Sequence, residues 1–530
     1  MTKWVEKLRS RGRLFNFRPA LFAAVFFALG MVFYYAYSVH GTPVLFGLLG
    51  LPALWAVLPF TQNRFSSALA LALLTLCFSL GVIVLRAETE RYHDGGRYTG
   101  KATVIGVVSE FCEYENETWS IRIDEPMIND KREAYAFYGR LYKNEKIKLG
   151  DEVILRASIS TDLCISERLR DFASGVRYQG VVERIAVVDR SDDLFLNARR
   201  RVYDTIYKGF KGDAAPVTYA ILTGDDSGIA QGLLENVRMG GIAHIFAVSG
   251  LHIGALYAVC RALFERTKLN KLHRGWRFVF LTAILLFYGG ICGFSASVVR
   301  ATVMCLVVYA TFLTGLKTDL LERTGIAAFL ILLFNPASLF SLGFELSFAA
   351  CLSIGIFART VETWCSAGIS KLPIKRKPLT EAQAFFVRKR KKAVCSFLGV
   401  TLAVQVGTAP ITLLAFERFP LWSLPLNCLF VPLLSAVFPY LLAAVFFSAI
   451  LPLAATPVLL YVPSVLLNGG LFVFHAVDFA ACIRFALPAV ALLPYYAAFV
   501  LVSEKINLGW RWKLPVSGLL LVGTILLTVF

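Results

Sequence analysis

Two histidines and a serine form a compact polar cluster in an otherwise apolar part of the chain. They lie in the stretch His244-Ile-Phe-Ala-Val-Ser249-Gly250-Leu-His252-Ile-Gly254. Ionisable side chains are costly at membrane depth and therefore indicate a functional site by default. A helix would place His244 and His252 near one face, while Ser249 and Gly250 would permit close packing or a break. The stretch is either part of a functional site, or each of its polar residues is a packing residue whose hydrogen bonds are satisfied within the protein.

Four further polar residues lie within or beside long apolar runs. Arg300 and Glu345 could form a buried ion pair, or each could face the interior of a helix bundle or an aqueous cavity. Gln405 and Asn427 carry hydrogen-bonding amides. We treat all four, together with the histidine stretch, as candidates for a polar path through apolar helices.

No catalytic or metal-binding pattern accompanies these residues. A zinc site needs three or four ligands at workable spacing, and the six histidines form no HxxxH or HxHxD pattern. Ala-Val-Ser249-Gly-Leu lacks the first glycine of a nucleophile elbow, which disfavours a serine hydrolase. Asp225 and Asp226 lie in a glycine-rich turn, where we expect solvated carboxylates instead of a metal site. We expect no catalytic residue, no metal and no cofactor in this chain.

The composition indicates a polytopic membrane protein. Hydrophobic residues make up 57% of the 530 residues, and the mean hydropathy is +0.63; soluble domains average about 45 to 50% apolar residues. The formal net charge of +18 would suit binding to an anionic polymer. Membrane proteins, however, accumulate Lys and Arg in cytoplasmic loops to set their orientation. Most of this net charge is therefore not taken as evidence for an anionic ligand.

Long apolar runs predict about thirteen transmembrane helices. The first run follows a basic N-terminus, which predicts an uncleaved helix with a cytoplasmic N-terminus; a signal peptide is the competing interpretation. The strongly basic short loops then fall on the same side as the N-terminus. The run 323–334 is short and could instead be re-entrant. The expected spans are 19–37, 43–60, 65–85, 241–264, 276–292, 297–316, 323–334, 338–358, 393–416, 424–450, 453–475, 484–502 and 513–530.

An alternating, charged segment separates the third span from the rest of the chain. Runs rich in Val, Ile, Tyr and Phe predict five strands in it, which favours a small closed barrel such as an OB-fold, with a β-sandwich fragment as the alternative. Cys112 and Cys164 are its cysteines; export would favour a disulfide between them, and two free thiols are the alternative. The expected strands are 98–109, 118–124, 134–142, 151–160 and 176–188.

A basic amphipathic segment follows the β segment. Its apolar residues recur at helical spacing against Arg199, Arg200 and Arg201, which predicts a helix along the outer membrane face with these arginines on its polar side. The expected division of the chain is N-terminal membrane helices (1–86), an extracytoplasmic β domain (87–190), amphipathic linker helices (191–240) and a second membrane domain (241–530).

The histidine stretch resembles the signature of the ComEC family of competence channel proteins. The resemblance implies a bacterial inner-membrane channel that admits one strand of incoming DNA during natural transformation. Position 345 is usually neutral in that family, so we expect Glu345 to be paired, for example with Arg300, or turned away from the path. The likeness covers about 204–437 and includes Leu222-Thr-Gly-Asp225, Ser297-Val-Val-Arg300-Ala, Asn335-Pro336, Gly343-Phe-Glu-Leu-Ser-Phe348 and the 410–432 stretch with Asn427.

The resemblance also implies partners, namely single-stranded DNA, membrane lipid, a periplasmic or surface DNA receptor, a cytoplasmic helicase-like ATPase and a separate nuclease. Many relatives carry a metallo-β-lactamase-like domain after the helices, whereas this sequence has no such histidine-aspartate cluster, so we expect no nuclease activity. In the β domain carboxylates slightly outnumber Lys and Arg, which disfavours strong nonspecific DNA binding. The alternatives are a transporter or flippase of another anionic polymer or lipid-linked substrate and, more distantly, an intramembrane hydrolase.

Overall fold

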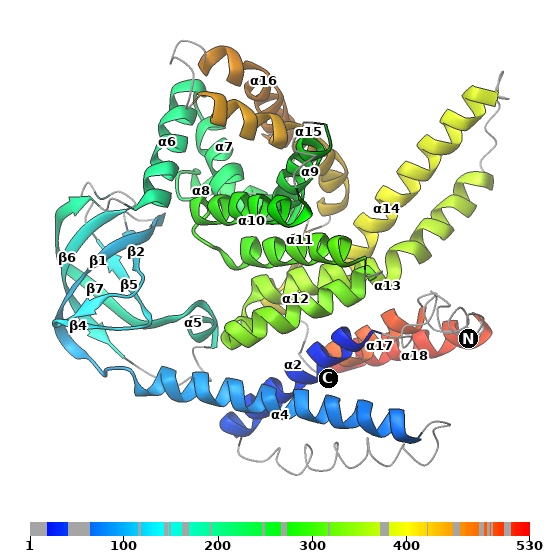
Figure 1. The fold of residues 1–530 in the computed structure, drawn as a ribbon, viewed down its shortest axis with the longest axis horizontal. Coiled ribbons are helices and arrows are strands. Elements are labelled where there is room, and N and C mark those ends of the chain that lie inside the picture. The colour runs from blue at the N-terminus through cyan, green and yellow to red at the C-terminus, as the bar shows by residue number, and fades with distance from the viewer. Residues whose placement is uncertain are drawn as a thin grey trace.

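The computed structural model in Figure 1 combines a β-barrel with a large set of helices. It describes residues 18–40, 64–114, 118–142, 147, 150–161, 169–190, 193–245, 248, 250–266, 273–315, 318–371, 381–420, 422–448, 456–475, 482–484, 488, 491–502 and 510–529.

Seven helices in the described part of the chain are long and apolar enough to cross a membrane. From residue 276 onward, every run expected as a span contains a helix, and the run 43–60 lies outside the described residues. The bounds are α2 (Pro19–His40), α4 (Arg64–Asp94), α9 (Gly250–Arg266), α10 (Arg274–Ile291), α11 (Ala296–Thr314), α12 (Leu320–Phe334), α13 (Leu342–Lys371), α14 (Glu381–Phe416), α15 (Ser423–Ser448), α16 (Thr456–His475), α17 (Leu492–Val502) and α18 (Trp510–Val529).

Glycines bring α2 and α4 into backbone contact. A Cβ atom added to Gly30 would clash with the Phe78 carbonyl oxygen, and one added to Gly81 would clash with the Phe27 carbonyl oxygen. Small residues allow this close approach in membrane helices, where van der Waals packing drives association. Gly325 of α12 meets the backbone of α2 in the same way, so α2, α4 and α12 form one tightly packed group.

The β domain is a closed five-stranded barrel, which confirms the expected barrel over the sandwich. The five expected strands are present, with ends that differ by a few residues, and a short β3–β4 hairpin and α5 (Leu169–Ser174) are added. Antiparallel pairs join β1 to β2 and β6, β2 to β5, and β6 to β7, and a parallel pair of β5 with β7 closes the ring. The strands are β1 (Thr99–Tyr114), β2 (Thr118–Ile123), β5 (Ala136–Leu141), β6 (Asp151–Ser160) and β7 (Val176–Arg190).

The end of α4 is fastened to the barrel by buried contacts. Arg177 of β7 is 1% exposed, and its Nη2 donates to the carbonyl oxygens of His93 (3.1 Å) and Gly95 (2.6 Å) at the end of α4. Its guanidinium lies over the rings of Tyr92 and Tyr178. A cation here satisfies carbonyls left open by the helix end and complements the helix dipole. The barrel therefore packs directly against the end of α4 and is not connected to it by a free linker.

Two large hydrophobic cores organise most of the described residues, and a smaller one joins α13, α14 and α17. One joins α2, α4, the barrel, α12 and the beginning of α13. The other joins α6 (Leu194–Gly209), α7 (Ala214–Thr223) and α8 (Gln231–Met239) with α9, α10, α11, α15 and α16. This second core contains residues from both sides of the expected domain boundary at residue 240, and nearly all of α7 is buried in it. The segment expected as linker helices therefore packs as part of the helical domain.

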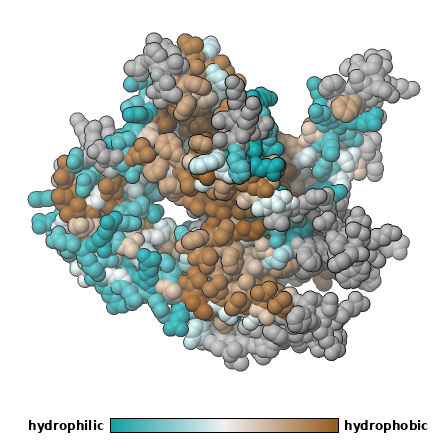
Figure 2. All heavy atoms as spheres, in the orientation of Figure 1, coloured by the Kyte–Doolittle hydropathy of each residue, from teal (hydrophilic) through white to brown (hydrophobic). Residues whose placement is uncertain are grey.

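The surface follows the same arrangement. Figure 2 shows hydrophobic residues gathered over the central helices and hydrophilic residues over the barrel and the far ends of α13 and α14. Such an apolar band between polar ends is the surface that a hydrocarbon layer covers.

Replacing Gly30 or Gly81 by alanine should destabilise the α2–α4 pair. Each added methyl group would meet a carbonyl of the other helix, and overpacking of this kind costs about 1–3 kcal/mol. We expect G30A and G81A to lower the thermal unfolding midpoint of the full chain in detergent micelles. Gly518→Ala in α18 is the matched control, because its methyl group meets nothing within 4 Å. Midpoints equal to that of the control would contradict the close crossing.

Acid should loosen the barrel through Glu133. Burial alone raises the pKa of this carboxyl, but hydrogen bonds from Tyr178 (2.7 Å), Tyr98 (2.9 Å) and the Gly96 N–H bring the net pKa below its ordinary value of 4.5. The stability that ionised Glu133 supplies is present above pH 4.5 and is lost as the pH falls through the lower folded-state pKa. We expect the unfolding midpoint of wild type to depend more steeply on pH in this acidic range than that of E133Q. The exposed-site variant Glu110→Gln should behave as wild type, and identical pH profiles for all three would refute the role of Glu133.

Candidate functional site

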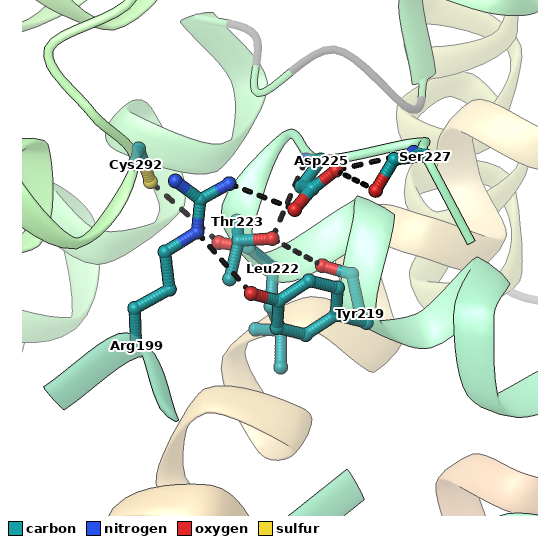
Figure 3. A network of polar contacts seen from close by, with 7 residues as sticks. All are labelled: Arg199, Tyr219, Leu222, Thr223, Asp225, Ser227 and Cys292. Atoms are coloured by element: carbon teal, nitrogen blue, oxygen red, sulfur yellow. Dashed lines mark hydrogen bonds and ion pairs between the residues drawn. The ribbon is translucent and has the colours of Figure 1, made fainter. Parts of the chain in front are cut away.

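A buried ion pair lies at the turn that follows α7 (Figure 3). Gly224 ends the helix with a left-handed backbone (φ 81°), which glycine adopts without steric penalty. Asp225 Oδ2 then lies 3.1 Å from Arg199 Nη2 of α6. Arg199 Nε also donates to Tyr219 Oη at 3.2 Å, and the hydroxyl and N–H of Ser227 both donate to Asp225 Oδ1. Every charged group of the network therefore has a partner.

Both members of this pair differ from expectation. The amphipathic pattern predicts Arg199 on the polar face of α6 and a solvated Asp225, whereas the two side chains are only 11% and 16% exposed. Burial alone lowers the pKa of Arg199, but neighbouring Tyr219 and Asp225 outweigh it and the net pKa is raised. Burial, and then the charge of Asp225, raises the pKa of Asp226. Consecutive arginines on an amphipathic helix do not reveal which of them turns inward.

The same network connects α7 to α10. The carbonyl oxygen of Leu222 accepts hydrogen bonds from Tyr288 Oη (2.7 Å) and Cys292 Sγ (3.6 Å) of the α10 end. The last carbonyls of a helix have no partner within it, so these bonds complete the end of α7. Gly293, next in the chain, lies beside the Arg199 guanidinium. Three segments that are distant in sequence therefore meet at Arg199.

The histidine stretch packs against this turn. A Cβ atom on Gly224 would lie 3.3 Å from Val248 Cγ2. His244 belongs to a separate 3-10 turn, η2 (Ala243–Ile245), and α9 begins only at Gly250. The two histidines therefore do not share one helical face, and of the two alternatives for Ser249-Gly250 the structure has a break in the helix before Gly250. Ser249 lies outside the described residues.

The two histidines have different surroundings. His252 is 1% exposed, and its ring packs edge-on against Phe438 of α15 at 4.5 Å between centroids. His244 is exposed. Gly250 lines a shallow groove of about 560 Å³ between α9 and α15, together with Gly254, Ala258 and Pro439 among others. His252 is thus a packing residue of the helical core, and Gly250 borders open space.

Gln405 and Asn427 are brought together by a serine that the sequence reasoning missed. Ser423 Oγ lies 3.0 Å from Gln405 Oε1 and accepts from Asn427 Nδ2 at 3.1 Å. It also lies 3.5 Å from the Gly241 carbonyl oxygen. Asn427 is 8% exposed, and its Oδ1 has no hydrogen-bond partner in the described part of the chain. Ser423 could have been found from the sequence, because it lies at the start of a helix and four residues before Asn427, which places the two side chains on the same helical face.

Arg300 and Glu345 do not form the expected ion pair. Arg300 is 3% exposed and donates from Nη2 to Ser297 Oγ at 2.9 Å. Its Nε and Nη1 have no hydrogen-bond partner among the described residues, and no carboxylate lies within ion-pair distance of it there. Glu345 is exposed. The expected pairing of Glu345 with Arg300 is therefore absent among the described residues, and its position relative to a path remains a prediction.

These residues offer hydrogen bonds and positive charge within apolar helices. Among the residues that the structure describes, no three His, Cys, Asp or Glu side chains are grouped so that they could hold a metal ion. Cys164 and the side chain of Cys112 are outside the described set, so the expected disulfide falls there as well.

Comparison with known proteins adds a family match. A family model described as "Competence protein" matches residues 221–506. The chain is 26% identical over 237 residues to the ComE operon protein 3 of Bacillus subtilis, which covers 45% of this chain and 27% of the relative. It is 36% identical over 111 residues to an uncharacterized protein of Mycoplasma pneumoniae, covering 21% of this chain and 27% of that one. The chain thus matches under a third of the length of these relatives, and no solved structure matches it.

Asp225→Asn should destabilise the helical core. It leaves the buried Arg199 charge without its counter-ion, and breaking a buried ion pair costs about 3 kcal/mol or more. Asp226→Asn is the matched control, since it makes the same change at the neighbouring carboxylate, which forms no ion pair with Arg199 among the described residues. We expect a lower thermal unfolding midpoint for D225N than for D226N in detergent micelles. Replacing both partners with apolar residues, as in Arg199→Met with Asp225→Leu, should recover part of the loss, and equal midpoints for D225N and D226N would contradict the role of the pair.

Proposed function

The chain belongs to the competence protein family, and we propose that it forms an inner-membrane channel through which single-stranded DNA enters the cytoplasm during natural transformation. The observation that carries this proposal is Arg300, a buried cation with no carboxylate partner among the described residues. An unpaired charge at membrane depth is costly and is retained where it meets a ligand or an ion path. A polyanion supplies the missing negative charge.

The arrangement of the helix ends is consistent with an entrance on the barrel side. The barrel helix α5 contacts η4 (Pro336–Phe340), which directly precedes α13. Arg18, next to the N-terminus of α2, pairs with Asp319 at the start of α12. With a cytoplasmic N-terminus, α12 runs outward, α13 runs inward, and the barrel faces the extracytoplasmic side.

The polar path in this proposal runs between the helices that carry Gly250, Arg300 and the Gln405–Ser423–Asn427 group. A single strand requires cationic or hydrogen-bonding walls that tolerate any sequence, and these side chains provide both kinds of contact. His244, which is exposed, and Ser249 complete the expected lining. Glu345 remains outside the path.

Partners follow from the channel assignment. They are a surface or periplasmic DNA receptor, a helicase-like ATPase on the cytoplasmic side and a separate nuclease that removes the other strand. Membrane lipid surrounds the helices. A Cys112–Cys164 disulfide would cross-link the extracytoplasmic barrel.

Deletion of the gene should abolish transformation. We expect the deletion strain, or a transformable relative whose own family member is deleted, to lose both transformants and labelled DNA in the cytoplasm, and the wild-type gene to restore both. Labelled DNA should still bind at the cell surface, because binding precedes passage through the membrane.

Two results would overturn the channel assignment. Normal transformation in the deletion strain would contradict it directly. Loss of a surface polysaccharide or lipid-linked product, with DNA uptake intact, would favour the alternative of a transporter or flippase for another anionic substrate.

A further inference from the structure

We propose that Arg300 and the N-terminus of α13 together form a binding site for one phosphodiester group of the passing strand. This inference rests on the proposed channel function and names the contact that the channel makes with the DNA backbone.

The positive side chain of the site is held in place by α11. Arg300 lies in the second turn of that helix, and its Nη2 is anchored on Ser297 Oγ of the preceding turn at 2.9 Å. This bond leaves Nε and Nη1 as free donors among the described residues. Arginine presents its donors in a planar fork that matches two oxygens of a phosphate. A buried guanidinium with one nitrogen anchored and two others unpaired among the described residues has donors available for such an anion.

The second part of the site is the start of α13, a helix of 30 residues. Ser341 caps it by accepting from the N–H groups of Phe344 (3.2 Å) and Glu345 (3.1 Å), through its hydroxyl and its carbonyl oxygen respectively. The first two N–H groups, of Leu342 and Gly343, donate to no acceptor among the described residues. Open N–H groups and the helix dipole attract anions at this end.

Gly343 joins the two parts. A Cβ atom built on it would lie 3.7 Å from Arg300 Nη1 and 4.0 Å from Nη2. A side chain at this position would contact the guanidinium directly, whereas glycine, which is exposed, leaves only its own backbone between the buried guanidinium and the surface. Arg300 itself is only 3% exposed, so in this proposal the phosphate approaches over Gly343.

The nearby carboxylate faces elsewhere. Glu345 follows Gly343 by two residues, which is about 200° of rotation around an α-helix. It therefore projects from the opposite side of α13, and it forms no ion pair with Arg300 among the described residues. A carboxylate so placed complements the helix N-terminus and does not neutralise the guanidinium.

The site lies where the two hydrophobic cores meet. Val298 and Ala301 of α11 belong to the core around α9 and α15, whereas Phe344 and Phe348 of α13 belong to the core shared with the barrel. A strand bound at Arg300 and Gly343 would contact both. This position suits a channel whose walls come from two packed units.

Binding of a fluorescent oligothymidylate to the full chain in phosphatidylcholine nanodiscs tests the site. On a single strand, each phosphate contact contributes about 0.7 to the slope of log K against log salt. We expect Arg300→Gln to weaken binding and to reduce that slope by about 0.7, whereas Arg300→Lys, which keeps the charge, should retain the slope. Gly343→Ala should weaken binding with Arg300 intact. Arg261→Gln, which removes an exposed arginine paired with Glu265, and Gly518→Ala are the matched controls.

The probe's backbone separates charge recognition from base recognition. An otherwise identical oligonucleotide with uncharged methylphosphonate linkages should bind wild type and R300Q equally weakly. If R300Q does not fold, as judged by its gel-filtration profile, R300K and G343A decide the outcome. Nanodiscs with added phosphatidylglycerol distinguish the source of the phosphate: if that lipid abolishes the difference between wild type and R300Q, the site takes a lipid headgroup and the assignment to DNA is overturned.

The outcomes for the site and for the channel can be distinguished. Unchanged affinity and slope in R300Q and G343A, with wild type still binding and importing DNA, would overturn the phosphate site and leave the channel standing. Failure of wild type to bind or import DNA at all would overturn the channel itself.

Discussion

The ion pair between Arg199 and Asp225 is the interaction on which the helical domain depends. A charge buried among apolar residues is tolerated only when it is paired and hydrogen-bonded. Here Tyr219 and Ser227 supply the additional bonds, and the α10–α11 turn at Gly293 closes over the guanidinium. One pair therefore sets the relative positions of α6, the end of α7 and the start of α11. The histidine stretch rests on the same turn through Gly224 and Val248.

The barrel packs together with α2, α4 and α12 in the hydrophobic core that does not contain Arg199. Arg177 ties β7 to the end of α4, and Gly30 and Gly81 bring α4 into backbone contact with α2. The barrel, α4, α2 and α12 are therefore joined by direct packing contacts. The proposed phosphate site lies between this unit and the helical domain, so relative motion of the two would change the distance between Arg300 and α13.

The strongest agreement between expectation and structure concerns regular elements. The five barrel strands and the apolar helices follow from local periodicity and turn residues, which depend on near neighbours in the chain. The failures concern side chains whose partners are distant in sequence. The pattern of α6 predicted Arg199 facing solvent, the Arg300–Glu345 pair was one of the two arrangements expected for Glu345, and the apolar run 241–264 was expected to carry His244 into the same helix as His252. In each case the deciding contact involves a residue on another element or a break in the helix.

The class of protein, the barrel strands and most helix positions could thus be read from the amino-acid sequence, because burial of apolar faces and turn chemistry are local and periodic. The family followed from the resemblance of the histidine stretch to a known signature. The sequence also named Gln405 and Asn427 but not Ser423, which lies between them. Only the folded structure shows which arginine is paired with a carboxylate and which has unpaired donors. Arg199 and Arg300 are chemically identical side chains, and only the placement of Asp225 beside one and of Gly343 beside the other makes the first structural and the second a candidate anion site.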